Sequence, residues 1–484
     1  MKKLQIFTIC CLSIFAVSYS IVQACGGWEE DYSSIFAPEV VGLEDELYFR
    51  ELYSSIKIGE YGHKEYFNQT NTSYWFDFFE KKVKKEDINQ ILYTYDIGVI
   101  NNLIFTLKGK EKAETKNGIL KFSDKKKAMS FLYYIGFAKR CEAVNQKEYW
   151  HDGDRTGDIS INEIEKLING GVKNFESNPY PKIKQRYGMQ LTRLHFALGS
   201  KGQETSINTN LNAHQFFTKN TSHFDQQNLT FHRAKGYAAG YLRRVKQTNL
   251  ANVLYAQLHR VPEMKNIAQL SFSAEDEEEF KKTIGLAKTI ADKTTLWKLR
   301  GLEIDGLNSM KEIYKLNPKA DELNILLSRC VNMQEEDLDF FLQNGNQLYF
   351  TTEDNSHHEY DNYSKEEQTE IYQFIKNVAE KGNTKLPVVW NLAAGYLAAI
   401  QKEHTTANNF FLKAQGTSGS SKLVTEQIRL LSLINRLEAT DNYGEQLVDN
   451  LSIEIKWLFK EQHENLLRTD VAKVYAKRKL NKLH

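Results

Sequence analysis

Residues 390–414 read WNLAAGYLAAIQKEHTTANNFFLKA and hold the clearest structural signal in the chain. The first half carries small residues at helical spacing, and the second half repeats this pattern around one aromatic residue: Ala394, Gly395 and Ala398, then Ala407, Phe411 and Ala414. Small residues are needed where two helices cross closely, and an aromatic side chain four positions after Ala407 fills the gap to the next element. The stretch therefore predicts a pair of antiparallel helices.

Weaker versions of this pattern occur elsewhere between residues 180 and 415. They consist of apolar and small residues on a first helix, followed after a connection by a second set: Tyr187, Leu191 and Leu194 before Ala213 and Phe217; Ala239, Gly240 and Leu242 before Ala251, Tyr255 and Leu258; and Trp297, Gly301 and Leu302, with Pro318 near the end of its pair. The spacing between copies is irregular, so the pattern predicts a series of hairpins without a fixed period.

This pairing resembles tetratricopeptide repeats over about half of the chain. The resemblance implies an all-α fold, an irregular tetratricopeptide-like stack of antiparallel helical hairpins (α-solenoid-like). The alternative is an irregular helical domain whose hairpins merely use Ala and Gly at their crossings. Six prolines in 484 residues, and the lack of alternating runs joined by Asn-Gly or Asp-Gly turns, favour helices in either case.

Local signals place several helix boundaries. Ser123-Asp124 is expected to cap a helix through Ala138, and Pro179 and Pro181 are expected to open another that ends at Gly199. The segment Gly118–Phe122 is interpreted as a short extended piece.

The expected organisation has six parts. They are a signal peptide at 1–24, an N-terminal helical region at 25–150, a loop with its exit helix at 151–178, a helical-repeat region at 179–350, a polar loop at 351–364, and a C-terminal helical-repeat region at 365–484.

The N-terminus reads as a secretory signal. Lys2 and Lys3 precede an uncharged, largely apolar run, and Val22-Gln23-Ala24 offers a cleavage site before Cys25. The same residues resemble a bacterial lipobox, which makes Cys25 a candidate lipidation site. The sequence thus predicts an exported protein, either periplasmic or lipid-anchored to the cell envelope, with contact to the membrane only through a lipid on Cys25.

Cleavage after Ala24 leaves 61 basic and 62 acidic residues, a balance that gives no reason to expect nucleic acid as a partner. Two further cysteines remain beside Cys25, namely Cys141 and Cys330. They either pair in a disulfide or act as buried small hydrophobic residues, and the second interpretation is preferred.

Residues 152–163, DGDRTGDISINE, resemble the calcium loop of an EF-hand. The resemblance implies oxygen ligands at six positions of the loop: Asp152, Asp154, Thr156, Asp158, Ser160 and Glu163. Gly157 takes the position of the sharp turn, and Ile159 the apolar position that anchors the loop. Calcium is therefore the expected cofactor.

The loop departs from the EF-hand pattern in two respects, and a metal-free alternative is open. Thr156 is a weaker ligand than the usual residue there, and Lys147–His151 lacks the familiar apolar residue before the first ligand. Ser160 and Glu163 also form the sequence signature of a capping box, which would start the next helix without calcium.

No motif of a known catalytic site is complete. His463-Glu464 lacks the second histidine of a zinc protease, Ser54-x-x-Lys57 lacks its companion motifs, and His357-His358-Glu359 is best explained as surface residues. A resemblance to exported bacterial helical-repeat proteins beginning CGGW adds a location but no activity. The first hypothesis is a non-enzymatic scaffold for a protein or peptide partner, with one calcium loop. The second is a cell-envelope enzyme of the glycan or peptide hydrolase type, whose site is assembled only by the fold.

Overall fold

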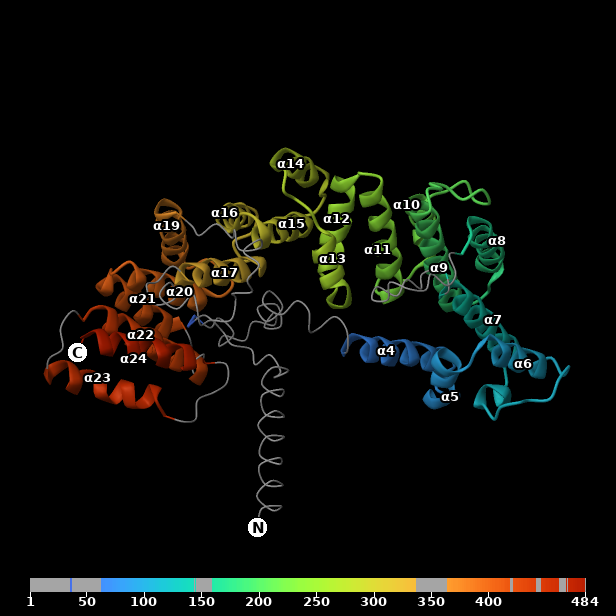
Figure 1. The fold of residues 1–484 in the computed structure, drawn as a ribbon, viewed down its shortest axis with the longest axis horizontal. Helices are drawn as coiled ribbons and strands as arrows, with labels where there is room; N and C mark the ends of the chain where they lie inside the picture. The colour runs from blue at the N-terminus through green and yellow to red at the C-terminus, as the bar shows by residue number, and fades with distance from the viewer. Residues whose placement is uncertain are drawn as a thin grey trace, which may run out of the picture. The chain divides into compact units, whose positions relative to one another are not determined.

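All regular elements of the described chain are helices (Figure 1). The computed structural model describes residues 35–36, 62–142, 144, 159–336, 364–417, 421–440, 445–460, 467 and 469–483, and no strand occurs in these ranges. The prediction of an all-α fold is confirmed for this part of the chain. Among the helices of these ranges, none is both long enough and apolar enough to span a bilayer.

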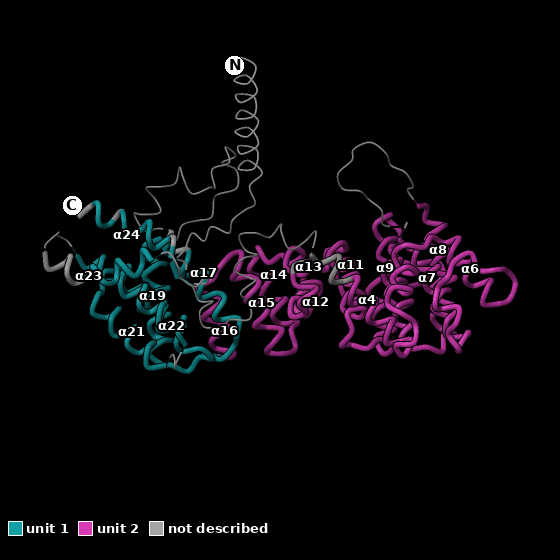
Figure 2. The backbone as a smooth tube through the Cα atoms, turned by 90° about the horizontal axis from the view of Figure 1, so that it is seen from below, with its two compact units in different colours: residues 1–53, 318–484 teal, residues 54–317 magenta. Residues whose placement is uncertain are grey.

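The chain divides into two compact units, coloured separately in Figure 2. Unit 2 comprises residues 54–317, and unit 1 comprises residues 318–484 together with residues 1–53, of which 35–36 are described.

The helices of unit 2 are α4 (Gly62–Phe78), α5 (Lys85–Asn89), η2 (Gln90–Thr94), α6 (Ile97–Leu107), η3 (Gly118–Lys121), α7 (Lys125–Glu142), α8 (Ile161–Ser177), α9 (Pro181–Ser200), α10 (Ala213–Lys219), η5 (Thr221–His223), α11 (Leu229–Arg244), α12 (Thr248–His259), η6 (Pro262–Met264), α13 (Lys265–Ser271), α14 (Glu277–Leu286), α15 (Ile290–Glu303) and α16 (Gly306–Leu316).

The helices described in unit 1 are α17 (Glu322–Glu336), α19 (Lys365–Lys381), α20 (Pro387–Ile400), α21 (His404–Thr417), α22 (Lys422–Glu438), α23 (Glu445–Leu458) and α24 (Thr469–Leu483). In both units the closest packing is between helices that are near neighbours in sequence. Unit 2 packs α8 on α9, α9 on α11, α11 on α12, and α15 on α16, while unit 1 packs α19 on α20 and α20 on α21.

The crossing of α20 and α21 shows why the sequence needs a residue without a side chain. Gly395 lies in α20, and a Cβ atom built on it would stand 2.6 Å from the ring of Phe411 and 3.2 Å from the carbonyl oxygen of Ala407, both in α21. Ala407 and Phe411 are themselves buried. The two helices predicted from residues 390–414 therefore form, and glycine lets them approach.

A smaller crossing of this kind joins α9 to α11. Gly199 was expected to end a helix, but α9 continues through Ser200. The left-handed backbone that favours glycine is instead found at Gly202, where φ is +84°. A Cβ atom on Gly199 would stand 3.0 Å from the flexible guanidinium end of Arg244 and 3.3–3.4 Å from the Tyr241 ring, so this glycine eases the packing of α9 on α11.

The expectation of an extended piece at Gly118–Phe122 is wrong. Residues Gly118–Lys121 form the 3-10 turn η3, whose start is capped by the Asn117 side chain accepting a hydrogen bond from the Ile119 amide. Ile119 is fully buried in the core of unit 2. A single tight turn satisfies these amides and still buries the isoleucine, which explains why the local pattern was misread.

One carboxylate holds the long connection between α9 and α10. Glu165 of α8 accepts hydrogen bonds from Gln203 Nε2 and Asn208 Nδ2 at 2.6 Å, and from Ser206 Oγ and the Ile207 amide at 2.8 Å. Burial would raise the pKa of the Glu165 carboxyl, but the hydrogen bonds from Ile207, Ser206 and Asn208 outweigh burial and lower that pKa.

His195 fastens the same connection from α9. One ring nitrogen lies 2.7 Å from the Leu191 carbonyl oxygen and the other lies 2.8 Å from Thr209 Oγ1. Burial lowers the pKa of His195 to about 4, so the ring is neutral at physiological pH.

We expect Gly395→Ala to destabilise unit 1 by about 1 kcal/mol. Alanine gains close to 1 kcal/mol in helix propensity, but forcing its methyl group against the Phe411 ring costs about 2 kcal/mol of overpacking. Urea unfolding followed by circular dichroism measures the change. Gly416→Ala is the matched control, because among the described residues nothing outside its own helix lies within 4 Å of the added Cβ, and it should be neutral or stabilising. Adding Phe411→Leu to Gly395→Ala should recover part of the lost stability. Equal effects of Gly395→Ala and Gly416→Ala would contradict the claim that α20 and α21 need a glycine where they cross.

Unit 2 should lose stability under mild acid. Burial lowers the pKa of four of its histidines, namely His195, His214, His232 and His259. Their unfolded forms take up protons below about pH 6.5, while folded His195 does so only near pH 4. The contribution of these histidines to the free energy of unfolding is therefore fully present above about pH 6.5 and is lost as the pH decreases. His195 alone should account for a loss of about 2 kcal/mol by about pH 5.

Thermal unfolding of the chain at a series of pH values tests this expectation. His195→Gln should flatten the pH dependence, because glutamine fills a similar space without titrating. His404→Gln, which lies in unit 1, serves as the control. If the unfolding temperature of His195→Gln depends on pH as steeply as that of the unsubstituted chain, the His195 ring does not link protonation to folding.

Candidate functional site

The predicted calcium loop is described only at its end. Asp152, Asp154, Thr156 and Asp158 lie outside the described residues, as does the candidate lipidation site Cys25. Ser160 and Glu163 are described, and they stand at the start of α8. Within the described ranges, no group of three or more His, Cys, Asp or Glu side chains is placed to hold a metal ion.

Ser160 and Glu163 form the capping box that their spacing predicts. Glu163 Oε2 accepts hydrogen bonds from the Ser160 amide and hydroxyl, each at 2.8 Å, and the Glu163 amide donates to Ser160 Oγ at 3.3 Å. The bond from the Ser160 amide is the main reason that the pKa of Glu163 is lowered. The carboxylate is thus ionised and directed at the N-terminus of α8, the charge state that a calcium ligand requires.

The two internal cysteines are buried thiols. Cys141 and Cys330 have no exposed surface and are not joined in a disulfide. Burial raises the pKa of the Cys141 thiol to about 12, which keeps it protonated and unreactive. The preferred interpretation of both as small hydrophobic residues agrees with this burial. The motif fragments Ser54-Lys57, His357–Glu359 and His463-Glu464 lie outside the described residues.

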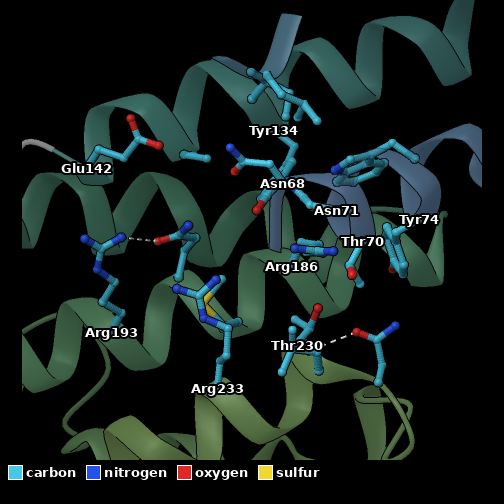
Figure 3. Close-up of a pocket in the computed structure, with 18 of the residues that line it drawn as sticks. Asn68, Thr70, Asn71, Tyr74, Tyr134, Glu142, Arg186, Arg193, Thr230 and Arg233 are labelled. Atoms are coloured by element: carbon cyan, nitrogen blue, oxygen red, sulfur yellow. Dashed lines mark hydrogen bonds between the residues drawn. The ribbon is translucent and has the colours of Figure 1, made fainter. Parts of the chain in front are cut away.

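Among the residues that the structure describes, a hollow of about 450 Å³ in unit 2 is our candidate for a binding site (Figure 3). We call it the arginine pocket. Helices α4, α7, α9 and α11 each contribute one face to it, and η2, η6 and the turn before α11 complete the wall. Its volume lies in the range of small-molecule and peptide side-chain sites.

Helical periodicity places the pocket residues. In α9, Arg186, Gln190 and Arg193 recur at four- and three-residue intervals and point into the hollow. The neighbouring face of α9 carries buried residues such as Tyr187 and Leu194, which fix the rotation of the helix against the core. Burial of the apolar face of α9 therefore determines which of its residues face the pocket.

Basic side chains outnumber acidic ones in the pocket wall. Among the described lining residues, four are basic (Lys139, Arg186, Arg193 and Arg233) and two are acidic (Glu142 and Glu263). The labelled arginines Arg186, Arg193 and Arg233 enter the hollow from α9 and α11 (Figure 3). The excess of positive charge in a concave site favours an anionic ligand.

Arg186 is held in place before any ligand arrives. Its guanidinium carbon lies 4.4 Å from the centre of the Tyr74 ring and 5.5 Å from that of Trp75. The ring centres of Trp75 and Phe131 are 4.7 Å apart in the core, and this contact fixes α4 against α7. Stacking on a rigid aromatic surface leaves the planar guanidinium oriented, which lowers the entropy that any ligand of this group would cost on binding.

Arg193 and Lys139 make looser contacts with the wall. Arg193 Nη1 donates to Gln190 Oε1 at 3.5 Å, and Lys139 Nζ donates to the Leu92 carbonyl oxygen at 3.1 Å. Both of these acceptors are neutral, so neither contact is an ion pair.

Neutral tyrosines and amides complete the wall. Tyr74 Oη donates to the Lys182 carbonyl oxygen at 2.9 Å and accepts from Gln185 Nε2 at 2.6 Å. Asn71 Nδ2 donates to Tyr93 Oη at 3.0 Å. Burial raises the pKa of Tyr74, Tyr93 and Tyr134, the last to about 12, so these phenols stay uncharged and do not repel an anion.

Sequence reasoning did not find the arginine pocket. It identified Tyr187, Leu191 and Leu194 as the buried face of a helix but passed over Arg186 and Arg193 on the adjacent face. The available signal was the seven-residue spacing of the two arginines beside a predicted core stripe. Arg233 and Lys139 reach the same hollow only through the packing of α7, α9 and α11, which no local pattern encodes.

Comparison with known protein families, characterised proteins and solved structures gives no match for this chain.

Proposed function

We propose that the protein is an exported, non-enzymatic interaction scaffold, and that the arginine pocket binds an acidic segment of a protein partner. The observation that carries this proposal is the convergence of four basic side chains on one concave wall of aromatic and amide groups. Carboxylates pair well with guanidinium groups in such a site, because both can form two parallel hydrogen bonds.

The architecture supports a scaffold. Successive helices pack on their sequence neighbours, and Gly395 and Gly199 provide the close crossings that hairpin stacks use. We extend this to an irregular, tetratricopeptide-like solenoid, in which helices such as α4, α7, α9 and α11 present a concave binding surface. The basic composition of the pocket favours binding over hydrolysis, which usually relies on paired carboxylates or an activated nucleophile.

Export is proposed on the N-terminal sequence. A signal at residues 1–24 would deliver the mature chain to the periplasm, with Cys25 as the candidate attachment point for a lipid.

An acidic probe peptide should bind the arginine pocket. The probe is a fluorescein-labelled octapeptide of alternating glutamate and alanine, measured by polarisation against its lysine–alanine counterpart. Arg186→Gln and Arg193→Gln should each weaken binding about tenfold, since each removes a charged hydrogen bond of about 1.5 kcal/mol. Binding should also weaken with added salt.

Lys121→Gln is the matched control for these arginine variants. Lys121 is an exposed basic residue of the same unit and does not line the pocket. If the control weakens binding as much as the arginine variants do, the attraction is a diffuse charge effect. If the lysine peptide binds equally well, the pocket does not recognise acids.

We also propose that the loop 152–163 binds one calcium ion. The ionised Glu163 carboxylate at the start of α8 supports this, since it would supply the last ligand of the loop. To reach the ion, Glu163 would give up at least part of its bonding to Ser160, which lowers the affinity.

Calorimetric titration with calcium should show one binding event in the mature protein and none in Asp152→Ala. Calcium at about ten times its dissociation constant should stabilise the folded chain by about 1.4 kcal/mol. Ser160→Ala removes the capping hydroxyl and should lower stability without calcium by about 1 kcal/mol. Because Ser160 is also a proposed ligand, the capping role is measured in the absence of calcium. Equal heats for the mature protein and Asp152→Ala would remove calcium from the proposal.

A further inference from the structure

Ile35 and Phe36 are fully buried in unit 1 although they lie near the opposite end of the chain from the helices around them. Their backbone amides both donate to the same oxygen, Glu335 Oε1, at 3.0 Å each. Glu335 belongs to the last turn of α17, and its side chain has no exposed surface.

Two further helices complete the surroundings of this dipeptide. The Phe36 ring is stacked on Tyr396 of α20, with ring centres 6.3 Å apart and an interplanar angle of 6°. Gln427 Nε2 of α22 donates to the Ile35 carbonyl oxygen at 3.5 Å. Tyr396 and Gln427 are likewise without exposed surface. We call the group formed by Glu335, Tyr396 and Gln427 the dipeptide site.

The contacts with Ile35 and Phe36 go to main-chain groups and to an aromatic ring rather than to a charged side chain of the dipeptide. A carboxylate removed from water is strongly destabilising unless hydrogen bonds replace its hydration, and Glu335 receives two of these bonds from backbone amides. Any peptide segment in the same conformation presents such amides. Hydrogen bonds to the main chain combined with enclosed side-chain volumes are a common mode of peptide binding.

We propose that the dipeptide site is a peptide-binding site that the chain fills with its own N-terminal segment. Its ligand class is a peptide segment in which a β-branched aliphatic residue is followed by an aromatic residue. The proposal concerns unit 1 and does not depend on the arginine pocket of unit 2.

Filling the site from within the chain makes it self-inhibited. A tethered segment acts at an effective concentration of roughly millimolar, so a competing peptide binds the intact chain weakly. Once the chain's own segment leaves, the same surfaces accept a partner peptide of this chemistry.

A labelled peptide of residues 31–40, DYSSIFAPEV, tests the site by fluorescence polarisation. The receptor is the full mature chain carrying Ile35→Ser and Phe36→Ser, which empties the site. We expect this variant to bind the peptide at least about tenfold more tightly than the unsubstituted chain does, because its own segment no longer competes. A peptide with serine in place of both Ile35 and Phe36 is the control and should not bind.

Adding Glu335→Gln to the emptied receptor should weaken binding about tenfold, since a charged acceptor of two amide bonds is lost. Equal binding of the peptide to emptied and unsubstituted chains, or binding to neither, would overturn the proposal.

A second measurement covers the case in which the emptied variant does not fold. A protease site inserted after residue 40 allows the unsubstituted chain to fold first and the segment to be cut afterwards. The labelled peptide should then replace the cut segment in a saturable exchange. Retention of the cut segment against excess peptide would show that Ile35 and Phe36 are a permanent part of the core, and the proposal would be wrong.

Discussion

The close packing of each helix on its neighbour in sequence is the constraint on which the rest of the structure depends. An amphipathic helix cannot bury its apolar side alone, and α20 is buried on all sides from Val388 to Ala399, so each hairpin needs others to cover it. The contact between Gly395 and Phe411 shows how closely two helices approach, because a single added carbon on Gly395 would stand 2.6 Å from the ring. Because these contacts fix the rotation of each helix, they also determine which side chains remain to line a hollow such as the arginine pocket.

Buried polar groups hold, by hydrogen bonds, the segments that do not pack as helices. Glu165 and His195 hold the connection after α9, and Glu335 holds Ile35 and Phe36. Each is removed from water and takes part in at least two directed hydrogen bonds, so each favours one arrangement of its partner segment. These groups give the two units defined geometry at their irregular parts, whereas apolar packing alone would leave the connections loosely placed.

Sequence reasoning anticipated the helical class and the hairpins best where the signal was local. The pair α20–α21 followed from residues 390–414, and the cap of α7 followed from Asp124, whose side chain accepts a bond from the Lys127 amide. It placed the end of α9 within one residue but chose the wrong glycine, because the left-handed backbone lies at Gly202 while Gly199 packs near α11. The arginine pocket and the dipeptide site could not be predicted in this way, because their members meet only through contacts between distant segments.

The position of Ile35 and Phe36 has a consequence for the order in which the chain is completed. Their partners Glu335 and Gln427 follow them by 300 and 392 residues, so the dipeptide leaves the ribosome long before its site exists. Unit 2, which lies wholly within residues 54–317, has all of its own contacts available earlier. Synthesis from the N-terminus therefore makes the contacts within unit 2 available before the partners of Ile35 and Phe36 have been made. Joining Ile35 to Gln427 also closes a loop of 392 residues, and the entropic cost of closure grows with loop length.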